Sequence, residues 1–249
     1  MSAIFGVRLH ELPSEARLRQ LCTDFLNGER TFRIYTPNPE ILLRARADRD
    51  YADVLNAADL ALPDGTGVAL VQSLRARRRV RRWPGVEIGA LLLELAAEQG
   101  VTVAFLGGAG DVAERAAARW RTRLPGLRIE VVGAGLPIDH DGMARPFERD
   151  PEIVEEIRAA APAIVLVGLG APKQERWIAR HAGDLPTVRI AIGIGGAFDM
   201  WAGSLRRAPR FLHRIGLEWV WRLVLEPARL PRIVRATVVF PFRALTERG

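Results

Sequence analysis

Asp64 is the side chain of this sequence best suited to act as a general base. It stands in Leu62-Pro63-Asp64-Gly65, where an apolar run ends in a proline and an acid precedes a glycine. A carboxylate beside a glycine can approach a sugar hydroxyl closely, and partial burial can raise its pKa towards a useful value. The same spacing fits a turn aspartate that caps the following helix, so both interpretations stay open at this point.

A second polar group, Lys173-Gln174-Glu175, opens a predicted helix directly after an apolar strand. Polar side chains at that position suit the orientation of a sugar or a diphosphate. The alternative is an ordinary first helical turn, in which the helix dipole would favour Glu175 alone. Lys173 is the only lysine in the chain, and this adds slightly to the first interpretation.

Glycine-rich turns follow two further apolar runs. Residues 107–110 read Gly-Gly-Ala-Gly before a predicted helix, and residues 193–196 read Gly-Ile-Gly-Gly. Backbone N–H groups at such a helix start can bind phosphate, and several such turns at one sheet edge favour a nucleotide diphosphate. NAD is a weaker alternative, because its ribose-binding acid should end the next strand, which instead ends Glu130-Val131-Val132-Gly133.

Neither a metal nor a nucleophilic cysteine is expected to carry the chemistry. Asp139-His140-Asp141 fits the Asp-x-Asp pattern that holds divalent ions in many nucleotide-sugar enzymes. It lies in a polar loop rich in glycine and proline, where aspartate is common for turn reasons, so we expect no metal cofactor. The single cysteine, Cys22, sits in an apolar helical pattern and is predicted to be buried.

Asp64, Lys173, Gln174 and the glycine turns stand at the same place in a repeated unit of strand, turn and helix, namely at the end of the strand. Alternating units of this kind predict an α/β fold, a Rossmann-like parallel sheet with helices on both faces, whose ligands bind at the carboxyl ends of the strands. The predicted strands are residues 3–9, 31–35, 57–62, 101–106, 127–132, 163–167 and 188–194. The predicted helices are residues 15–26, 40–49, 68–78, 86–99, 111–124, 152–161 and 176–181, with Asn38 as the cap of the second.

The character of the chain changes after about residue 203. We therefore divide it into a sheet-bearing domain, residues 1–203, and a basic, aromatic C-terminal helical appendage, residues 204–249. The appendage has ten arginines against three glutamates, an excess equal to the net charge of +7. Its arginines alternate with large apolar residues, which favours a membrane surface over nucleic acid. The basic run from Arg75 to Arg82 is taken as a solvated face.

Nine ordered motifs resemble those of the WecG/TagA/CpsF glycosyltransferases, over nearly the whole chain. The motifs are Thr36-Pro-Asn38, Leu62-Pro-Asp64-Gly-Thr-Gly67, Arg82-Trp-Pro-Gly85, Phe105-Leu-Gly-Gly108, Val167-Gly-Leu-Gly-Ala-Pro-Lys-Gln-Glu175, Gly193-Ile-Gly-Gly-Ala-Phe-Asp199, Arg207-Ala-Pro209, Gly216-Leu-Glu-Trp-Val-Trp-Arg222 and Glu226-Pro-Ala-Arg229.

The resemblance implies an inverting transferase that moves a sugar from a UDP-sugar to a polyprenyl-diphosphate-linked acceptor in cell-surface polysaccharide synthesis. The sugar would be N-acetylmannosamine, its uronic acid or a hexose. The catalytic positions it assigns are Asp64 as the base, with Thr36, Asn38 and Gln174. The donor contacts we expect are Arg82, Gly107, Gly108, Lys173, Gly195, Gly196 and Asp199, and the acceptor diphosphate would meet Arg222, Arg229 and Arg232.

The expected location is the inner face of the cytoplasmic membrane, as a peripheral protein. No signal peptide is readable, and no run of 18 uncharged apolar residues is present. A homo-oligomer is possible, and nucleic acid is not an expected partner. The main alternative is a non-catalytic nucleotide or nucleic-acid-binding protein that uses the basic tail.

Overall fold

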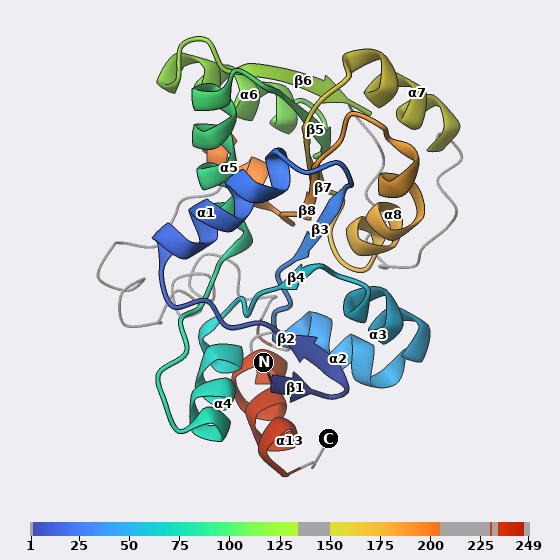
Figure 1. Cartoon of the computed structure of the whole chain (residues 1–249). Coiled ribbons are helices and arrows are strands. Elements are labelled where there is room, and N and C mark those ends of the chain that lie inside the picture. Colours follow the sequence, from blue (N-terminus) through green and yellow to red (C-terminus); the bar gives the residue numbers. More distant parts are fainter. Residues whose placement is uncertain (1, 134–149, 205–229, 231–233, 247–249) are drawn as a thin grey trace.

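Six parallel strands form the central sheet in the residues that the computed structural model describes, which are 2–133, 150–204, 230 and 234–246. Their order across the sheet is β4-β3-β8-β7-β5-β6 (Figure 1). The strands are β3 (Phe32–Tyr35), β4 (Leu60–Ala61), β5 (Thr102–Gly107), β6 (Arg128–Val132), β7 (Ile164–Gly168) and β8 (Ile190–Gly193). The predicted parallel α/β sheet is thus confirmed.

Helices cover both faces of this sheet. One face carries α1 (Glu15–Leu26), α5 (Gly85–Gln99), α6 (Val112–Arg123) and α9 (Ala197–Ala202). The other face carries α2 (Pro39–Ala47), α3 (Arg49–Asn56), α4 (Thr66–Ala76), α7 (Asp150–Ala160), α8 (Lys173–His181) with the 3₁₀ turn η1 (Ala182–Asp184), and α13 (Phe240–Thr246), which follows the π-helical turn η3 (Arg235–Val239).

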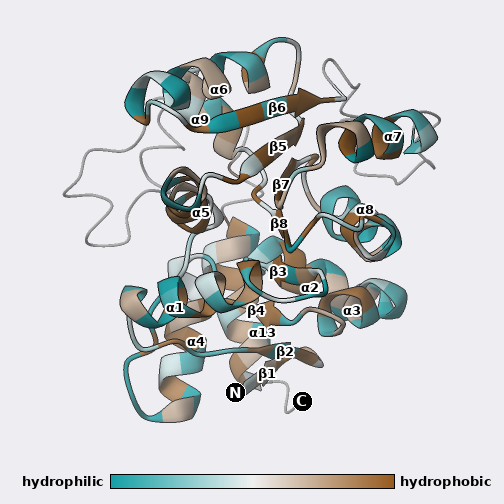
Figure 2. Cartoon of the chain, turned by 45° about the horizontal axis from the view of Figure 1, so that its top comes forward, coloured by the Kyte–Doolittle hydropathy of each residue, from teal (hydrophilic) through white to brown (hydrophobic). Residues whose placement is uncertain are grey.

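The strands are apolar throughout because they are buried on both sides. In β5, Val103 and Phe105 pack into the core of the first face, whereas Ala104 and Leu106 pack into the core of the second. The hydropathy colouring shows the same continuous apolar character along the central strands (Figure 2). Such strands place any polar side chain at their ends, where the chain leaves the sheet.

Three predicted elements differ in extent or in kind from the observed ones. The predicted helix 40–49 ends as α2 before Asp48, which is extended (φ −132°, ψ 100°) and accepts a hydrogen bond from Tyr51 N at 3.0 Å. A second helix, α3, which was not predicted, begins there. The predicted strand 57–62 is reduced to the two residues of β4. The predicted extended stretch 3–9 is an antiparallel hairpin of β1 (Ser2–Ile4) and β2 (Val7–Leu9).

Neighbouring strands are followed by helices on opposite faces along much of the sheet. The chain passes from β5 to α6 on one face and from β7 to α8 on the other, although β5 and β7 are adjacent. The adjacent strands β3 and β8 are likewise followed by helices on opposite faces, α2 and α9. Ligands of open α/β sheets bind outside the carboxyl ends of strands at such switch points.

Candidate active site

Asp64 follows the carboxyl end of β4, and its backbone is fixed by pairing with the segment that follows β3. Leu62 N donates to Tyr35 O at 2.9 Å, and Asp64 N donates to Pro37 O at 3.0 Å. The N-cap of α4 is Gly65, at φ 86°, so Asp64 does not occupy the capping position that the alternative interpretation gave it. The half-buried Asp64 thus sits between a sheet edge and a helix start.

Thr36 and Asn38 lie at the same edge, directly after β3. The Asn38 side-chain oxygen accepts a hydrogen bond from Ile41 N at 3.0 Å, which confirms it as the cap of α2. Thr36 is buried, and a Cβ on Gly85 would lie 3.0 Å from its Oγ1. Because Asp64 is bonded to Pro37, between these two residues, the structure brings three of the predicted catalytic residues together.

Gln174 connects this edge to the turn after β8. Its side-chain oxygen accepts from Gly195 N at 3.0 Å, and its amide nitrogen donates to Glu175 Oε1 at 2.7 Å. The side chain is only 3% exposed. Its bonds therefore hold the backbone of the turn after β8, and direct contact between Gln174 and a substrate remains a prediction.

Glu175 holds the Gln174 side chain in position by accepting its hydrogen bond, a role that the sequence did not predict. Tyr51 OH donates to Glu175 Oε2 at 2.9 Å, and Tyr35 OH donates to the Glu175 backbone oxygen at 3.2 Å. Burial raises the pKa of the Glu175 carboxyl, and burial followed by the Glu175 charge raises the pKa of Tyr51. No sequence signal pairs Glu175 with Tyr51, which lies 124 residues away.

Gly193, the last residue of β8, allows Gln174 to lie against the strand. A Cβ at Gly193 would fall 2.6 Å from Gln174 Nε2 and 2.8 Å from its Cδ. Contacts under 3.0 Å force a shift of one of the partners. The glycine is therefore needed for the close approach between the α8 side chain and β8.

Gly107 ends β5 and Gly108 follows it, with φ of 92° and 93°, a conformation that favours glycine. A Cβ on Gly108 would lie 3.3 Å from Ala113 N of α6, and one on Gly168 would lie 2.6 Å from a Phe198 ring carbon. These glycines permit tight packing of α6 and α9 against the strand ends. Their contact with a diphosphate stays a prediction.

The other predicted donor contacts surround the same sheet edge. Lys173 is the first residue of α8 and is buried, while Arg82 is half-buried and lies between α4 and α5. Asp199 is in the first turn of α9, and Gly196 is the N-cap of that helix. Both lie beyond the carboxyl end of β8, as the sequence predicted.

Several predicted features lie outside the described residues. These are the acceptor arginines Arg222, Arg229 and Arg232, and the Asp139-His140-Asp141 segment. Among the residues that are described, no group of three or more His, Cys, Asp and Glu side chains could hold a metal ion. No helix within these ranges is both long enough and apolar enough to cross a membrane.

Comparison with known proteins identifies the family of this chain. The profile described as "Glycosyl transferase WecG/TagA/CpsF family" matches residues 2–249. This chain belongs to the WecG/TagA/CpsF glycosyltransferase family. It is therefore an enzyme, and the family places the chemistry in glycosyl transfer, in line with the resemblance of the nine motifs.

Three relatives of this WecG/TagA/CpsF chain share the name N-acetylglucosaminyldiphosphoundecaprenol N-acetyl-beta-D-mannosaminyltransferase. A Bacillus spizizenii protein of that name is 35% identical over 85% of this chain and 78% of its own length. A Bacillus subtilis protein is 33% identical over 81% and 74%, respectively. A Staphylococcus aureus protein is 28% identical over 80% and 74%.

Proposed function

We propose that this chain is an inverting transferase that moves a sugar from a UDP-sugar to a polyprenyl-diphosphate-linked acceptor. N-acetylmannosamine is the sugar that the names of its relatives favour, and N-acetylglucosaminyl-diphosphoundecaprenol is the acceptor they name. The uronic acid of N-acetylmannosamine or a hexose is the alternative for the transferred sugar. The product would be an intermediate of cell-surface polysaccharide synthesis.

The observation that carries this proposal is the position of Asp64. It is the carboxylate that shares the edge of β3 and β4 with Thr36 and Asn38, and its backbone is fixed by the bond to Pro37. A base must lie where an acceptor hydroxyl can reach it, and strand ends are the usual ligand edge of such sheets. The residue that follows it, Gly65, has no side chain that could hinder the approach of a hydroxyl to the carboxylate.

In the proposed reaction, Asp64 removes the proton from the acceptor hydroxyl. The hydroxyl oxygen attacks the anomeric carbon from the face opposite UDP, and the bond between that carbon and the diphosphate oxygen breaks. UDP leaves with the bonding electrons, and the configuration at the anomeric carbon is inverted. General base catalysis of this type typically contributes about 10²–10⁴-fold to the rate.

The departing UDP carries negative charge that must be stabilised. We propose that backbone N–H groups of the glycine turns, with Lys173 or an arginine, supply this stabilisation without a metal ion. The hydrogen bond from Gly195 N to the Gln174 side chain supports a fixed shape for the turn after β8. N–H groups held in a fixed position stabilise a developing charge without having to reorganise.

The proposed location is the inner face of the cytoplasmic membrane, because the acceptor is anchored in a lipid. The C-terminal segment, residues 204–249, would contact the acceptor diphosphate and the bilayer through its arginines and aromatic residues. Nucleic acid is not proposed as a partner.

A donor screen tests the proposal. The full chain is incubated with a short-chain polyprenyl-diphosphate-linked N-acetylglucosamine and, separately, with UDP-N-acetylmannosamine, its uronic acid form and UDP-glucose, with and without EDTA. We expect one donor to extend the acceptor by one sugar, which mass spectrometry detects. The anomeric configuration of the product should be inverted, and EDTA should have no effect. Failure of every UDP-sugar would contradict the transferase proposal, and loss of activity in EDTA would contradict the metal-free mechanism.

A further inference from the structure

Among the residues that the structure describes, the strongly exposed large apolar side chains lie in α4 and in the C-terminal segment. In the part of the chain that the structure describes, the large hydrophobic residues that are strongly exposed number seven. They are Leu70, Leu74, Leu230, Val234, Val238, Phe242 and Leu245. Single exposed apolar residues are normal on any surface, but their concentration in one region marks an interaction site.

Two of these seven residues belong to α4, and the others are Leu230 and four residues of the C-terminal segment 234–246, which packs against α4. A Cβ on Gly67, near the start of α4, would lie 3.3 Å from Ala236 O and 3.7 Å from a Phe240 ring carbon. Near the other end, the Arg75 side chain donates to Ala244 O. The two segments therefore run side by side, as Figures 1 and 2 also show.

Each segment buries one side and exposes apolar residues on another. In α4, Val68 and Val71 are buried in the core, while Leu70 and Leu74, one helical turn apart, are 52% and 55% exposed. In the C-terminal segment, Phe240 and Ala244 are buried. Val234, Val238, Phe242 and Leu245 are exposed at spacings of four, four and three, which places them along one helical face.

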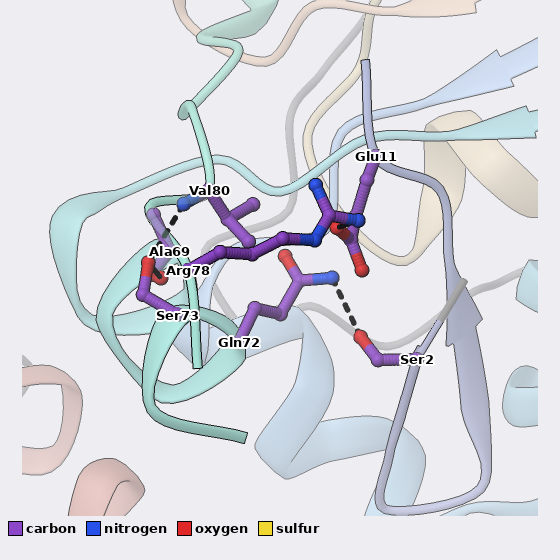
Figure 3. Close-up of polar contacts among 7 residues, drawn as sticks. All are labelled: Ser2, Glu11, Ala69, Gln72, Ser73, Arg78 and Val80. Carbon is purple, nitrogen blue, oxygen red and sulfur yellow. Dashed lines mark hydrogen bonds and ion pairs between the residues drawn. The ribbon is translucent and has the colours of Figure 1, made fainter. Parts of the chain in front are cut away.

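The polar residues of α4 tie it to the N-terminal segment and to the turn that follows it, so its exposed face is held in place (Figure 3). Gln72 Nε2 donates to Ser2 Oγ at 2.8 Å, and Arg78 forms an ion pair with Glu11. Ser73 Oγ donates to Ala69 O at 2.6 Å and accepts from Val80 N at 2.9 Å. Leu70 and Leu74 are absent from this polar network.

The charge around the apolar residues is entirely positive in sequence. Residues 66–82 and 234–246 contain eight arginines and no aspartate or glutamate. Within the described ranges, Arg77, Arg79, Arg235 and Arg243 are exposed and have no ion-pair partner. An exposed apolar face flanked by arginines is the composition of a surface that lies on an anionic bilayer.

We propose that α4, Leu230 and residues 234–246 together form one membrane-binding face that takes anionic phospholipid headgroups. The apolar residues enter the headgroup boundary, and the unpaired arginines meet the lipid phosphates. The face thus includes α4, a helix of the part of the chain that carries the sheet. It also includes the basic run 75–82, which the sequence alone suggested to be a solvated face. The inference deepens the proposed function, on which it rests for the presence of a lipid-linked acceptor.

This placement has a consequence for the candidate active site. α4 begins directly after Asp64-Gly65, and a helix rises about 1.5 Å per residue, so Leu74 lies roughly 14 Å from Gly65 along the axis. A bilayer held against α4 would therefore lie near the sheet edge that carries Asp64. A lipid-anchored diphosphate could then reach that edge without leaving the headgroup layer.

Vesicle binding tests this proposal independently of catalysis. The full chain is mixed with phosphatidylcholine vesicles that contain or lack phosphatidylglycerol, with no acceptor lipid present, and bound protein is measured by flotation. We expect salt-sensitive binding to the anionic vesicles only. Leu70→Glu with Leu74→Glu should lower that binding about tenfold or more, because burial of each leucine contributes to it.

The matched control places the same charge change on an exposed helix of the opposite face. Ala118→Glu with Thr122→Glu on α6 should bind vesicles as the wild type does. The Leu70/Leu74 variant should keep its turnover on a water-soluble acceptor, which separates membrane docking from a failure of the proposed reaction. If that variant does not fold, Phe242→Glu replaces it, because the Phe242 side chain is 69% exposed. The same fall in vesicle binding is expected.

Two results would overturn the proposal. One is unchanged vesicle binding by the folded Leu70→Glu/Leu74→Glu variant. The other is a wild type that forms an oligomer and a variant that is a monomer, with equal vesicle binding by both. That result would show that the face is a contact between copies of the chain. Size-exclusion chromatography with light scattering on both proteins distinguishes these results.

Discussion

At the residue scale, the site is held in shape by buried polar side chains. Gln174 bonds to Gly195 N on one side and to Glu175 on the other, and Glu175 is held in turn by Tyr51. A buried network of this kind is stabilising only while each member keeps its partners. The turn after β8 therefore depends on side chains that need not touch a substrate.

Gly193→Ala tests this dependence, because the added Cβ would fall 2.6 Å from Gln174 Nε2. We expect displacement of Gln174, a loss of about 1–3 kcal/mol in the free energy of unfolding, and a fall in turnover of about tenfold or more. The measurements are urea denaturation and the sugar-transfer rate.

Gly183→Ala is the control for that substitution. Gly183 lies in η1, and a Cβ there would meet no heavy atom within 4 Å. Its stability and turnover should match those of the wild type. Full turnover in Gly193→Ala would show that the position of Gln174 does not matter to the reaction.

At the element scale, the short strand β4 is held from both sides. On the inner side, Leu62 N bonds to Tyr35 O of β3. On the outer side, His10 N donates to Ala61 O at 2.7 Å, and His10 Nδ1 accepts from Ala61 N at 3.0 Å. The imidazole thus acts as an additional strand partner, just before the chain reaches Asp64.

His10 makes the stability of this edge dependent on pH. Burial lowers its pKa from the ordinary value of 6.5, and only the form with an unprotonated Nδ1 can accept from Ala61 N. The unfolded chain therefore binds the proton more readily than the folded chain. The free energy of unfolding should decrease as the pH falls through 6.5 and reach its lower level below the folded-state pKa.

Urea denaturation of the wild type and of His10→Asn, at about pH 7.5 and about pH 5, measures this effect. The asparagine oxygen can take the place of Nδ1 as an acceptor but does not titrate. The variant should therefore lose less stability on acidification than the wild type does. An equal loss in both proteins would assign the pH dependence to groups other than His10.

At the scale of the whole molecule, the C-terminal helix helps to complete the core of the sheet. Phe240 of α13 is fully buried, and its ring packs edge-on against Phe5 of the N-terminal hairpin with centroids 5.9 Å apart. Gly67 of α4 lies beside the same ring, which is 3.7 Å from the position that a Cβ on this glycine would take. Both ends of the chain therefore meet on one side of the sheet.

Phe240→Ala should lower the free energy of unfolding by about 3–5 kcal/mol, because it removes a fully buried ring. Phe242→Ala, on the same helix but 69% exposed, should change it by less than about 0.5 kcal/mol. Urea denaturation of both variants gives the comparison. Equal effects would mean that α13 does not pack on the core as described.

The sequence predicted the parts of this molecule that depend on local pattern. The helix at residues 15–26, the cap at Asn38 and the parallel sheet all follow from periodicity and capping, and the structure confirms them. The partners of Glu175 and the burial of Phe240 did not follow, because each depends on contacts between residues more than 100 positions apart. The helix α3 was not predicted, and it begins at the cap Asp48 directly after α2 ends.

The central claim is that Asp64 takes the proton from the acceptor hydroxyl during transfer from a UDP-sugar. The most direct test is single-turnover transfer by the wild type and by Asp64→Asn, with UDP binding measured on both proteins. We predict that the variant binds UDP as the wild type does, while its transfer rate falls about 10²–10⁴-fold. An Asp64→Asn enzyme that transfers the sugar at the wild-type rate would contradict the account.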